Sequence, residues 1–71
     1  MKPGDLRQFK PKSYAPDEPS IGGKSFMIMA VNERPYNVYV DLLMNGKVLE
    51  EWSYRWVEAN SETLEPVQIH P

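Results

Sequence analysis

Residues 38–52 read VYVDLLMNGKVLEEW, in which two apolar, β-prone runs flank the pair Asn45 and Gly46. An Asn-Gly pair readily adopts the two positive φ angles of a type I′ turn, whose twist matches that of antiparallel strands. The valine, tyrosine and tryptophan residues of the flanking runs favour extended backbone. The pattern therefore predicts a tight β-hairpin that turns at Asn45 and Gly46.

A two-residue turn also fixes which residues of the hairpin oppose one another. The predicted pairs are Leu42 with Leu49 and Val40 with Glu51 on one face, and Leu43 with Val48, Asp41 with Glu50 and Tyr39 with Trp52 on the other. Two carboxylates directly opposite each other are destabilising. Either this acidic pair is solvated at a sheet edge, or a β-bulge shifts the register by one residue.

Residues 24–31, KSFMIMAV, form an unbroken apolar run of strand length. The segment Arg34, Pro35 and Tyr36 stops a helical continuation, so a buried strand is favoured over a short helix. Alternation divides the run into two apolar faces, one with Phe26, Ile28 and Ala30 and the other with Met27, Met29 and Val31. The strand is therefore either covered on both sides or presents a methionine face to a partner.

The N-terminal part of the chain predicts a short strand followed by a long loop. Residues 4–9 form the strand, with Leu6 and Phe9 buried; their spacing of three suggests a bulge or a bend between them at Arg7 and Gln8.

Residues 10–23 are rich in proline, serine, glycine and acidic residues, so neither a helix nor a central strand can persist there. We expect Tyr14 and Ile21 to anchor this loop to the core.

The C-terminal part predicts a helical turn and a last strand. Residues 53–60 lack β alternation and suit a helical turn that stops at Asn60 in the left-handed conformation. Residues 64–69 offer a short strand, which Pro66 restricts to an edge or terminal position. The predicted fold is all-β, a small SH3-like barrel of about five short antiparallel strands with one long early loop and a short helical turn before the last strand.

A family resemblance covers nearly the whole chain. The chain carries Gly4, Asp5 and Leu6 followed by Phe9, then the hairpin VYVDLLMNGKV and the closing ETLEPV. This pattern resembles the small SH3-like proteins of bacteriophages and marine metagenomes, a largely uncharacterised group. The chain departs from the group's pattern at Arg7, Asn45, the acidic pair Glu50 and Glu51, and Pro66. The resemblance implies the fold, and it implies no reaction and no ligand.

At 71 residues the chain has room for a single domain, residues 1–71, and we expect residues 1–3 and 70–71 to be frayed. It contains no cysteine, which fits a reducing compartment. We therefore expect a cytoplasmic protein, found in the host cytoplasm or the virion if a phage encodes it. The start, MKPGDLRQFKPKSY, has charges and prolines where a signal peptide would be apolar, and we expect no membrane partner.

The net charge of −2 argues against nonspecific binding to nucleic acid, which normally needs a basic surface. The first third of the chain is nevertheless basic, with Lys2, Arg7, Lys10, Lys12 and Lys24, whereas the last third is acidic. A local basic patch is therefore compatible with the composition.

One string imitates a catalytic motif. Residues 22–25, GGKS, match the end of a phosphate-binding loop, but the first glycine of that motif falls at Glu18, and the motif needs a helix where this chain predicts a strand.

The remaining polar groups do not make a catalytic site either. Asp41, Glu50 and Glu51 lie on hairpin strands that face water, and His70 lies in the frayed C-terminal end. The serines have no histidine inside the fold to activate them. We expect no enzyme, no cofactor, no metal site and no small-molecule substrate.

The aromatic residues are the candidate functional feature. A candidate interaction surface comprises Tyr14, Tyr36, Tyr39, Trp52, Tyr54, Trp56, Met27 and Met29. In SH3 domains such aromatic residues line a groove for proline-rich peptides, and acids such as Asp17 and Glu18 of the long loop select a basic residue. The same residues can instead form the core of a chain this small.

The sequence therefore predicts a noncatalytic protein-interaction or structural module whose partner is another protein. That partner could be a second copy, bound through the Met27 and Met29 face or the Tyr39 and Trp52 face. The alternative is a nucleic-acid-associated accessory domain of the Tudor or KOW type, motivated by the fold and the basic N-terminal third.

Overall fold

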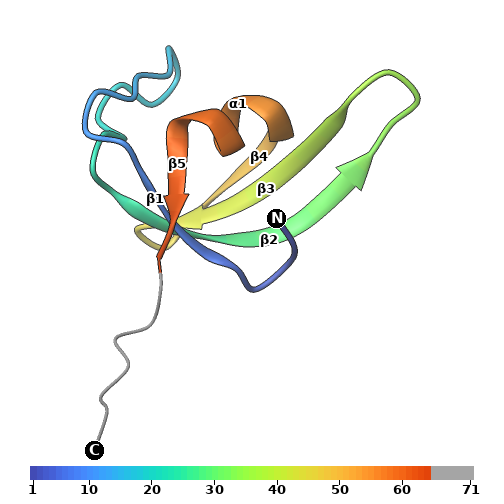
Figure 1. Ribbon diagram of the computed structural model, residues 1–71, viewed down its shortest axis with the longest axis horizontal. Helices are drawn as coiled ribbons and strands as arrows, with labels where there is room; N and C mark the ends of the chain where they lie inside the picture. The colour runs from blue at the N-terminus through green and yellow to red at the C-terminus, as the bar shows by residue number, and fades with distance from the viewer. Residues whose placement is uncertain (65–71) are drawn as a thin grey trace, which may run out of the picture.

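The computed structural model describes residues 1–64 (Figure 1). Its elements are β1 (Leu6–Phe9), β2 (Ser25–Glu33), β3 (Val38–Met44), β4 (Lys47–Ser53), α1 (Tyr54–Asn60) and β5 (Ser61–Thr63). The strands form one antiparallel sheet in the order β4-β3-β2-β1-β5. The predicted mostly-β fold with five antiparallel strands and a helix before the last strand is confirmed. Within residues 1–64, β4 and β5 lie at opposite edges, so the sheet is not closed.

The hairpin of β3 and β4 turns where the sequence predicts. Asn45 and Gly46 have φ angles of 53° and 75°, as a type I′ turn requires. Next to the turn Leu42 pairs with Leu49 and Leu43 with Val48, which confirms the predicted register there.

Further from the turn the register shifts by one residue. Val40 pairs with Trp52 and Tyr39 with Ser53, so the predicted pairs Val40 with Glu51 and Tyr39 with Trp52 are wrong. The cause is a bulge at Glu51, whose φ of 59° is left-handed; this is the second of the two alternatives that the sequence left open. Because one extra residue reverses the alternation, Trp52 turns to the core side of the sheet.

A second bulge lies in β2, on the other side of β3. Ile28 pairs with Leu42 and Ala30 with Asp41, which leaves Met29 as the extra residue. The predicted division of this strand into two apolar faces is therefore correct only as far as Met29. Beyond it Val31 packs against the core instead of sharing a face with the methionines.

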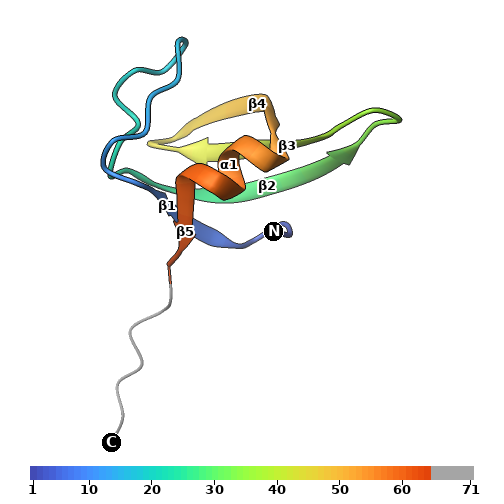
Figure 2. The ribbon, with the colours of Figure 1, turned by 45° about the horizontal axis from the view of Figure 1, so that its top comes forward.

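The core lies between the sheet and α1, which crosses one face of the sheet (Figure 2). Phe9 and Phe26 stack at its centre with ring centroids 4.3 Å apart. The fully buried side chains are those of Phe9, Ile21, Ile28, Leu42, Val40 and Val57. Burial of these side chains on one face of the sheet leaves the opposite face, called here the outer face, without a covering element among residues 1–64 (Figure 2).

The first strand differs from its prediction. β1 pairs with β2 without a register shift, so there is no bulge at Arg7 and Gln8. Regular alternation buries Phe9 and turns Leu6 outward, where it is 49% exposed rather than buried.

Met1 is also held in place. It packs against the core, and its ammonium group donates a hydrogen bond to Tyr54 Oη, so the predicted fraying of residues 1–3 does not extend to Met1.

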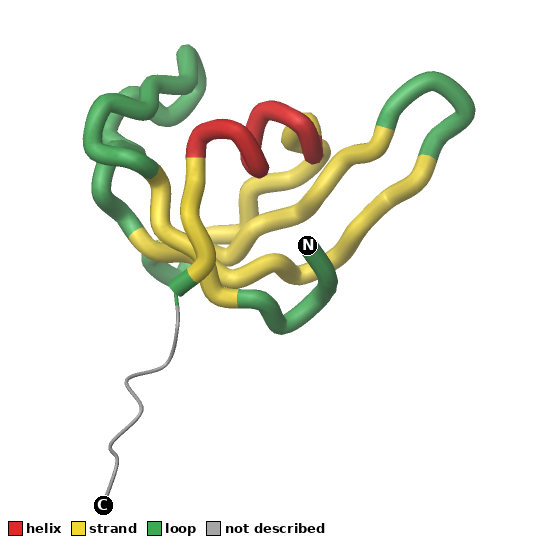
Figure 3. Tube along the Cα trace, in the orientation of Figure 1, coloured by secondary structure: helices red, strands yellow, loops and turns green. Residues whose placement is uncertain are grey.

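Residues 10–24 form the predicted long loop, which stands at one end of the sheet (Figure 3). Ile21 anchors it as predicted, but Tyr14 is 64% exposed. Ser13 and Ala15 are buried instead, because the Ser13 hydroxyl donates to the Asn60 carbonyl at 3.0 Å and draws this part of the loop toward α1.

The helix also ends differently from the prediction. Asn60 is not left-handed; its side-chain amide donates to the Trp56 carbonyl at 2.8 Å, and extended Ser61 follows at once as β5. The last strand therefore occupies Ser61–Thr63 rather than residues 64–69, of which 65–69 lie outside the described residues, as does the predicted frayed end 70–71.

Candidate functional site

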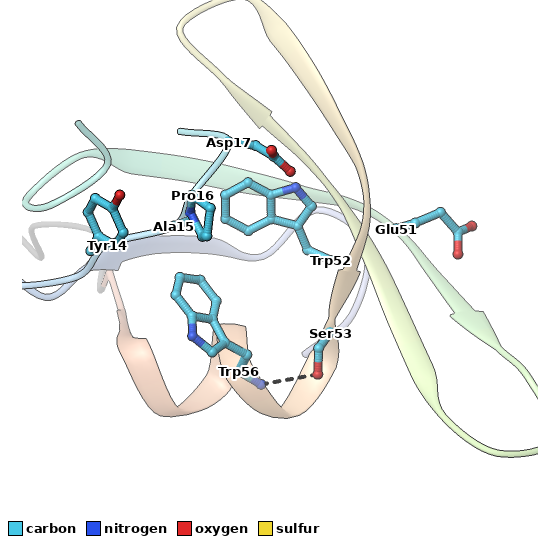
Figure 4. A pocket seen from close by; sticks show the side chains of 8 residues that line it. All are labelled: Tyr14, Ala15, Pro16, Asp17, Glu51, Trp52, Ser53 and Trp56. Atoms are coloured by element: carbon cyan, nitrogen blue, oxygen red, sulfur yellow. Dashed lines mark hydrogen bonds between the residues drawn. The ribbon is translucent and has the colours of Figure 1, made fainter. Parts of the chain in front are cut away.

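An aromatic groove of about 460 Å³ opens between the long loop, the end of β4 and the start of α1 (Figure 4). Its lining residues are Tyr14, Ala15, Pro16, Asp17, Glu51, Trp52, Ser53 and Trp56. Three segments that are separate in the sequence therefore build one concave surface.

The β4 bulge brings Trp52 into the aromatic groove. Without the extra residue Trp52 would point to the outer face, but the shifted register turns its indole toward the core, where it lies 6.0 Å from the Phe9 ring. One face of the indole is covered by the core while the side chain stays partly exposed. Trp52 can therefore act as a rigid wall for a ligand.

The first turn of α1 supplies Trp56. The Ser53 hydroxyl accepts a hydrogen bond from the Trp56 backbone amide at 3.4 Å and caps the helix (Figure 4). The two indoles meet edge to face, with centroids 5.6 Å apart and planes at 69°. Trp56 also lies 5.9 Å from Phe9, so both indoles rest on the same core ring. Together they form a corner with a fixed shape.

The long loop supplies the opposite side of the aromatic groove. Ala15 is buried, and the Glu18 amide donates to the Ala15 carbonyl at 3.0 Å, which closes a tight turn through Pro16 and Asp17. The ammonium group of Lys47 pairs with the Glu18 carboxylate and ties this turn to β4. Tyr14, Pro16 and Asp17 are consequently displayed from a fixed backbone.

The charge of the aromatic groove comes from two acids with different orientations. The Asp17 carboxylate lies beside the Trp52 indole, whereas that of Glu51 points away from the groove (Figure 4). Glu51 instead pairs with the Arg34 guanidinium at 2.8 Å. No lining residue is a lysine, arginine or histidine. A cation placed near Asp17 would therefore meet a carboxylate and indole faces without competition from a lining cation.

The structure brings three of the eight predicted surface residues together, namely Tyr14, Trp52 and Trp56. The others lie elsewhere: Tyr36 is 99% exposed in the turn between β2 and β3, Tyr39 pairs with Asn32 and Ser53, Tyr54 contacts Met1, Met27 lies on the outer face, and Met29 is the bulge residue of β2.

Sequence reasoning found Asp17 but did not assign Ala15, Pro16 or Ser53 to the aromatic groove. Pro16 lies directly before Asp17 and two residues after Tyr14, and this proximity was a usable signal. Ser53 was predicted as the first residue of the helical turn, whereas the structure makes it the cap before α1, a position that serine favours.

The residues considered for catalysis have structural roles here. Asp41 Oδ1 accepts hydrogen bonds from the Glu51 amide at 3.0 Å and from Asn32 Nδ2 at 3.3 Å. In the string GGKS the amides of Gly23 and Lys24 donate to the Phe9 and Ile21 carbonyls, so they are not available to phosphate. His70 lies outside the described residues.

Within residues 1–64, no group of three or more His, Cys, Asp or Glu side chains is placed to hold a metal ion. The described part of the chain also has no helix with the length and apolar character needed to cross a membrane. Comparison of the chain with models of protein families, with curated proteins and with solved structures found no match.

Proposed function

We propose that this chain is a noncatalytic interaction module that binds an extended segment of a partner protein in the aromatic groove. The segment would carry prolines or other flat apolar residues against Tyr14, Trp52 and Trp56, and a lysine or arginine beside Asp17. An extended, proline-containing segment loses little conformational entropy on binding, which suits a small open surface.

The observation that carries this proposal is the joint placement of a rigid indole corner and one unopposed carboxylate. Trp52 and Trp56 hold each other at 69° and both rest on Phe9, so they need no rearrangement to receive a ligand. Asp17 is exposed at the tip of the loop turn, and the groove contains no cation to neutralise it.

The arrangement also fits the predicted SH3-like fold and the resemblance to small phage and metagenomic proteins. A long loop after the first strand and a helix before the last strand flank the aromatic groove. This placement supports an SH3-like interaction module.

The nucleic-acid alternative receives less support. Bases could stack on the indoles, but phosphates would need nearby cations, and the lining residues offer only Asp17 and Glu51 as charged groups. Of the basic N-terminal residues, Arg7 is bonded to Ser61 and Thr63 at a different part of the sheet.

Tryptophan fluorescence provides a direct test, because Trp52 and Trp56 are the only tryptophans and both line the aromatic groove. We expect proline-rich decapeptides with one arginine or lysine to change the emission with micromolar to millimolar affinity. The same peptides with glutamate at the basic position should bind at least tenfold more weakly. Asp17→Asn should weaken the binding of the basic peptides severalfold, whereas Glu58→Gln, which changes an exposed acid of α1 outside the groove, should not.

Two results would contradict this assignment. One is equal affinity of the basic and acidic peptides, which would remove the role of Asp17. The other is a set of amide chemical-shift changes that avoids the lining residues altogether.

A further inference from the structure

A second apolar surface lies on the outer face, opposite α1. Leu6 pairs with Met27, Met27 with Leu43, and Leu43 with Val48, so these residues form one row across β1, β2, β3 and β4. Neighbouring strands are about 4.8 Å apart, which makes the row about 14 Å long. Leu6 and Val48 at its ends are each 49% exposed, and the two central residues are half-buried. These four residues form the outer row.

The outer row borders a hollow of about 310 Å³. The hollow is lined by Leu6, Ser25, Phe26, Met27, Leu43, Asn45, Gly46 and Leu64, none of which is charged. The hollow adjoins the row at Leu6, Met27 and Leu43, and it can accommodate large apolar side chains.

The charged strand residues of the outer face all have one sign. Among residues 1–64, strand alternation places three charged side chains on this face, those of Asp41, Glu50 and Glu62. The strand cations lie on the opposite face, where Arg7 contacts Ser61 and Lys47 contacts Glu18. A partner with basic residues beside its apolar ones would therefore complement the outer row.

The size of the face favours a slender partner over a second copy. Four strand spacings and about six residues of strand give a face of roughly 19 by 20 Å, or about 400 Å². Stable dimers bury about 800 Å² on each partner, twice that area. An α-helix with side chains is about 10–12 Å wide, which fits the outer row of about 14 Å.

We propose that the outer row binds one basic amphipathic helix of a partner protein. Its leucine-type side chains enter the hollow, and its lysines or arginines lie near Glu50 and Glu62. This surface is separate from the aromatic groove, so the chain can join two partners or two segments of one partner.

The test uses the whole chain and a synthetic 18-residue peptide with leucines on one helical face and lysines on the other. Fluorescence anisotropy should show binding, and amide chemical shifts should change at Leu6, Met27 and Leu43. Val48→Lys should weaken binding at least tenfold. Tyr36→Lys adds the same charge at a fully exposed turn and should have no effect beyond twofold.

A charge exchange keeps the test valid if Val48→Lys does not fold. The double variant Glu50→Lys with Glu62→Lys changes two exposed residues and should reverse the preference, binding a leucine and glutamate peptide better than the lysine one.

Three results would overturn the proposal. They are equal binding to Val48→Lys and Tyr36→Lys, shift changes confined to the aromatic groove, and a dimer of the free chain that Val48→Lys dissociates in light scattering. The last result would assign the outer row to a second copy.

Discussion

Asp41 Oδ1 accepts a hydrogen bond from the Glu51 backbone amide at 3.0 Å, so a side chain of β3 stabilises the bulge of β4. Asp41 also lies at the bulge of β2 on its other side, where Asn32 Nδ2 donates to the same oxygen. One carboxylate thereby stabilises the two register shifts that bend the sheet around the core. The aromatic groove depends on this contact, because the β4 bulge directs Trp52 inward.

Replacing Asp41 should cost stability and ligand binding together. Asp41→Ala leaves the Glu51 amide without its acceptor, and we expect the free energy of unfolding in urea to fall by about 1–2 kcal/mol. Asp41→Asn keeps an acceptor oxygen and should lose less. Glu50→Ala, at the exposed neighbouring position, should stay within about 0.5 kcal/mol of the parent. A stable Asp41→Ala variant with unchanged tryptophan emission would contradict the role given to this carboxylate.

Because the backbone of Glu51 is left-handed, we expect glycine to be more stabilising than alanine at this position. At φ = 59° a side chain is disfavoured, so Glu51→Gly should be more stable than Glu51→Ala by about 1 kcal/mol. Both variants lose the ion pair with Arg34, so that loss cancels in the comparison. Glu50 offers the matched control, because glycine should there be less stable than alanine. Thermal or urea unfolding of the four variants shows whether glycine or alanine gives the more stable protein at each position.

Gly22 should be intolerant of any side chain. A Cβ at Gly22 would lie 2.3 Å from the Pro11 carbonyl oxygen, a backbone atom that can move only if the loop moves. We expect Gly22→Ala to lower stability by about 2–3 kcal/mol and to displace Tyr14 and Asp17 from the aromatic groove. Gly23→Ala meets open space and should cost only about 1 kcal/mol for its positive φ. The reverse order of the two losses would show that the loop packs differently.

Local sequence signals predicted most elements, and the strand faces that were predicted wrongly in β2 and β4 have one physical source. The turn at Asn45 and Gly46, the strand run 24–31 and the Ser53 helical turn depend on near neighbours in the sequence, and all three are confirmed. The bulges of β2 and β4 depend on pairing between strands. They reversed the expected faces of Val31 and Trp52, which alternation alone cannot reveal.

The sequence predicted which types of residue line the aromatic groove, but not which individual aromatic residues do so. Aromatic residues near an acidic loop pointed to Tyr14, Trp52, Trp56 and Asp17, and these are the residues that meet. Tyr36 and Tyr39 have the same chemistry but lie in a turn and on a strand that face other directions. The register of β4 and the path of the long loop determine which of these aromatic residues line the groove.

Arg7 should hold the last strand in place through a specific set of hydrogen bonds. Its guanidinium donates to Ser61 Oγ at 2.8 Å, to the Ser61 carbonyl at 3.0 Å and to Thr63 Oγ1 at 3.2 Å. A lysine cannot reproduce this fork of donors, so Arg7→Lys should lower stability by about 1–2 kcal/mol.

Hydrogen exchange gives the local measurement for Arg7. The Leu64 amide donates to the Leu6 carbonyl at 3.0 Å, and we expect its protection to fall in Arg7→Lys more than that of Leu42 in the centre of the sheet. Arg55→Lys changes an exposed residue of α1 and should leave both amides and the unfolding midpoint unchanged. Uniform loss of protection in Arg7→Lys would instead mean that Arg7 stabilises the whole sheet, because β5 would then unfold only together with the core.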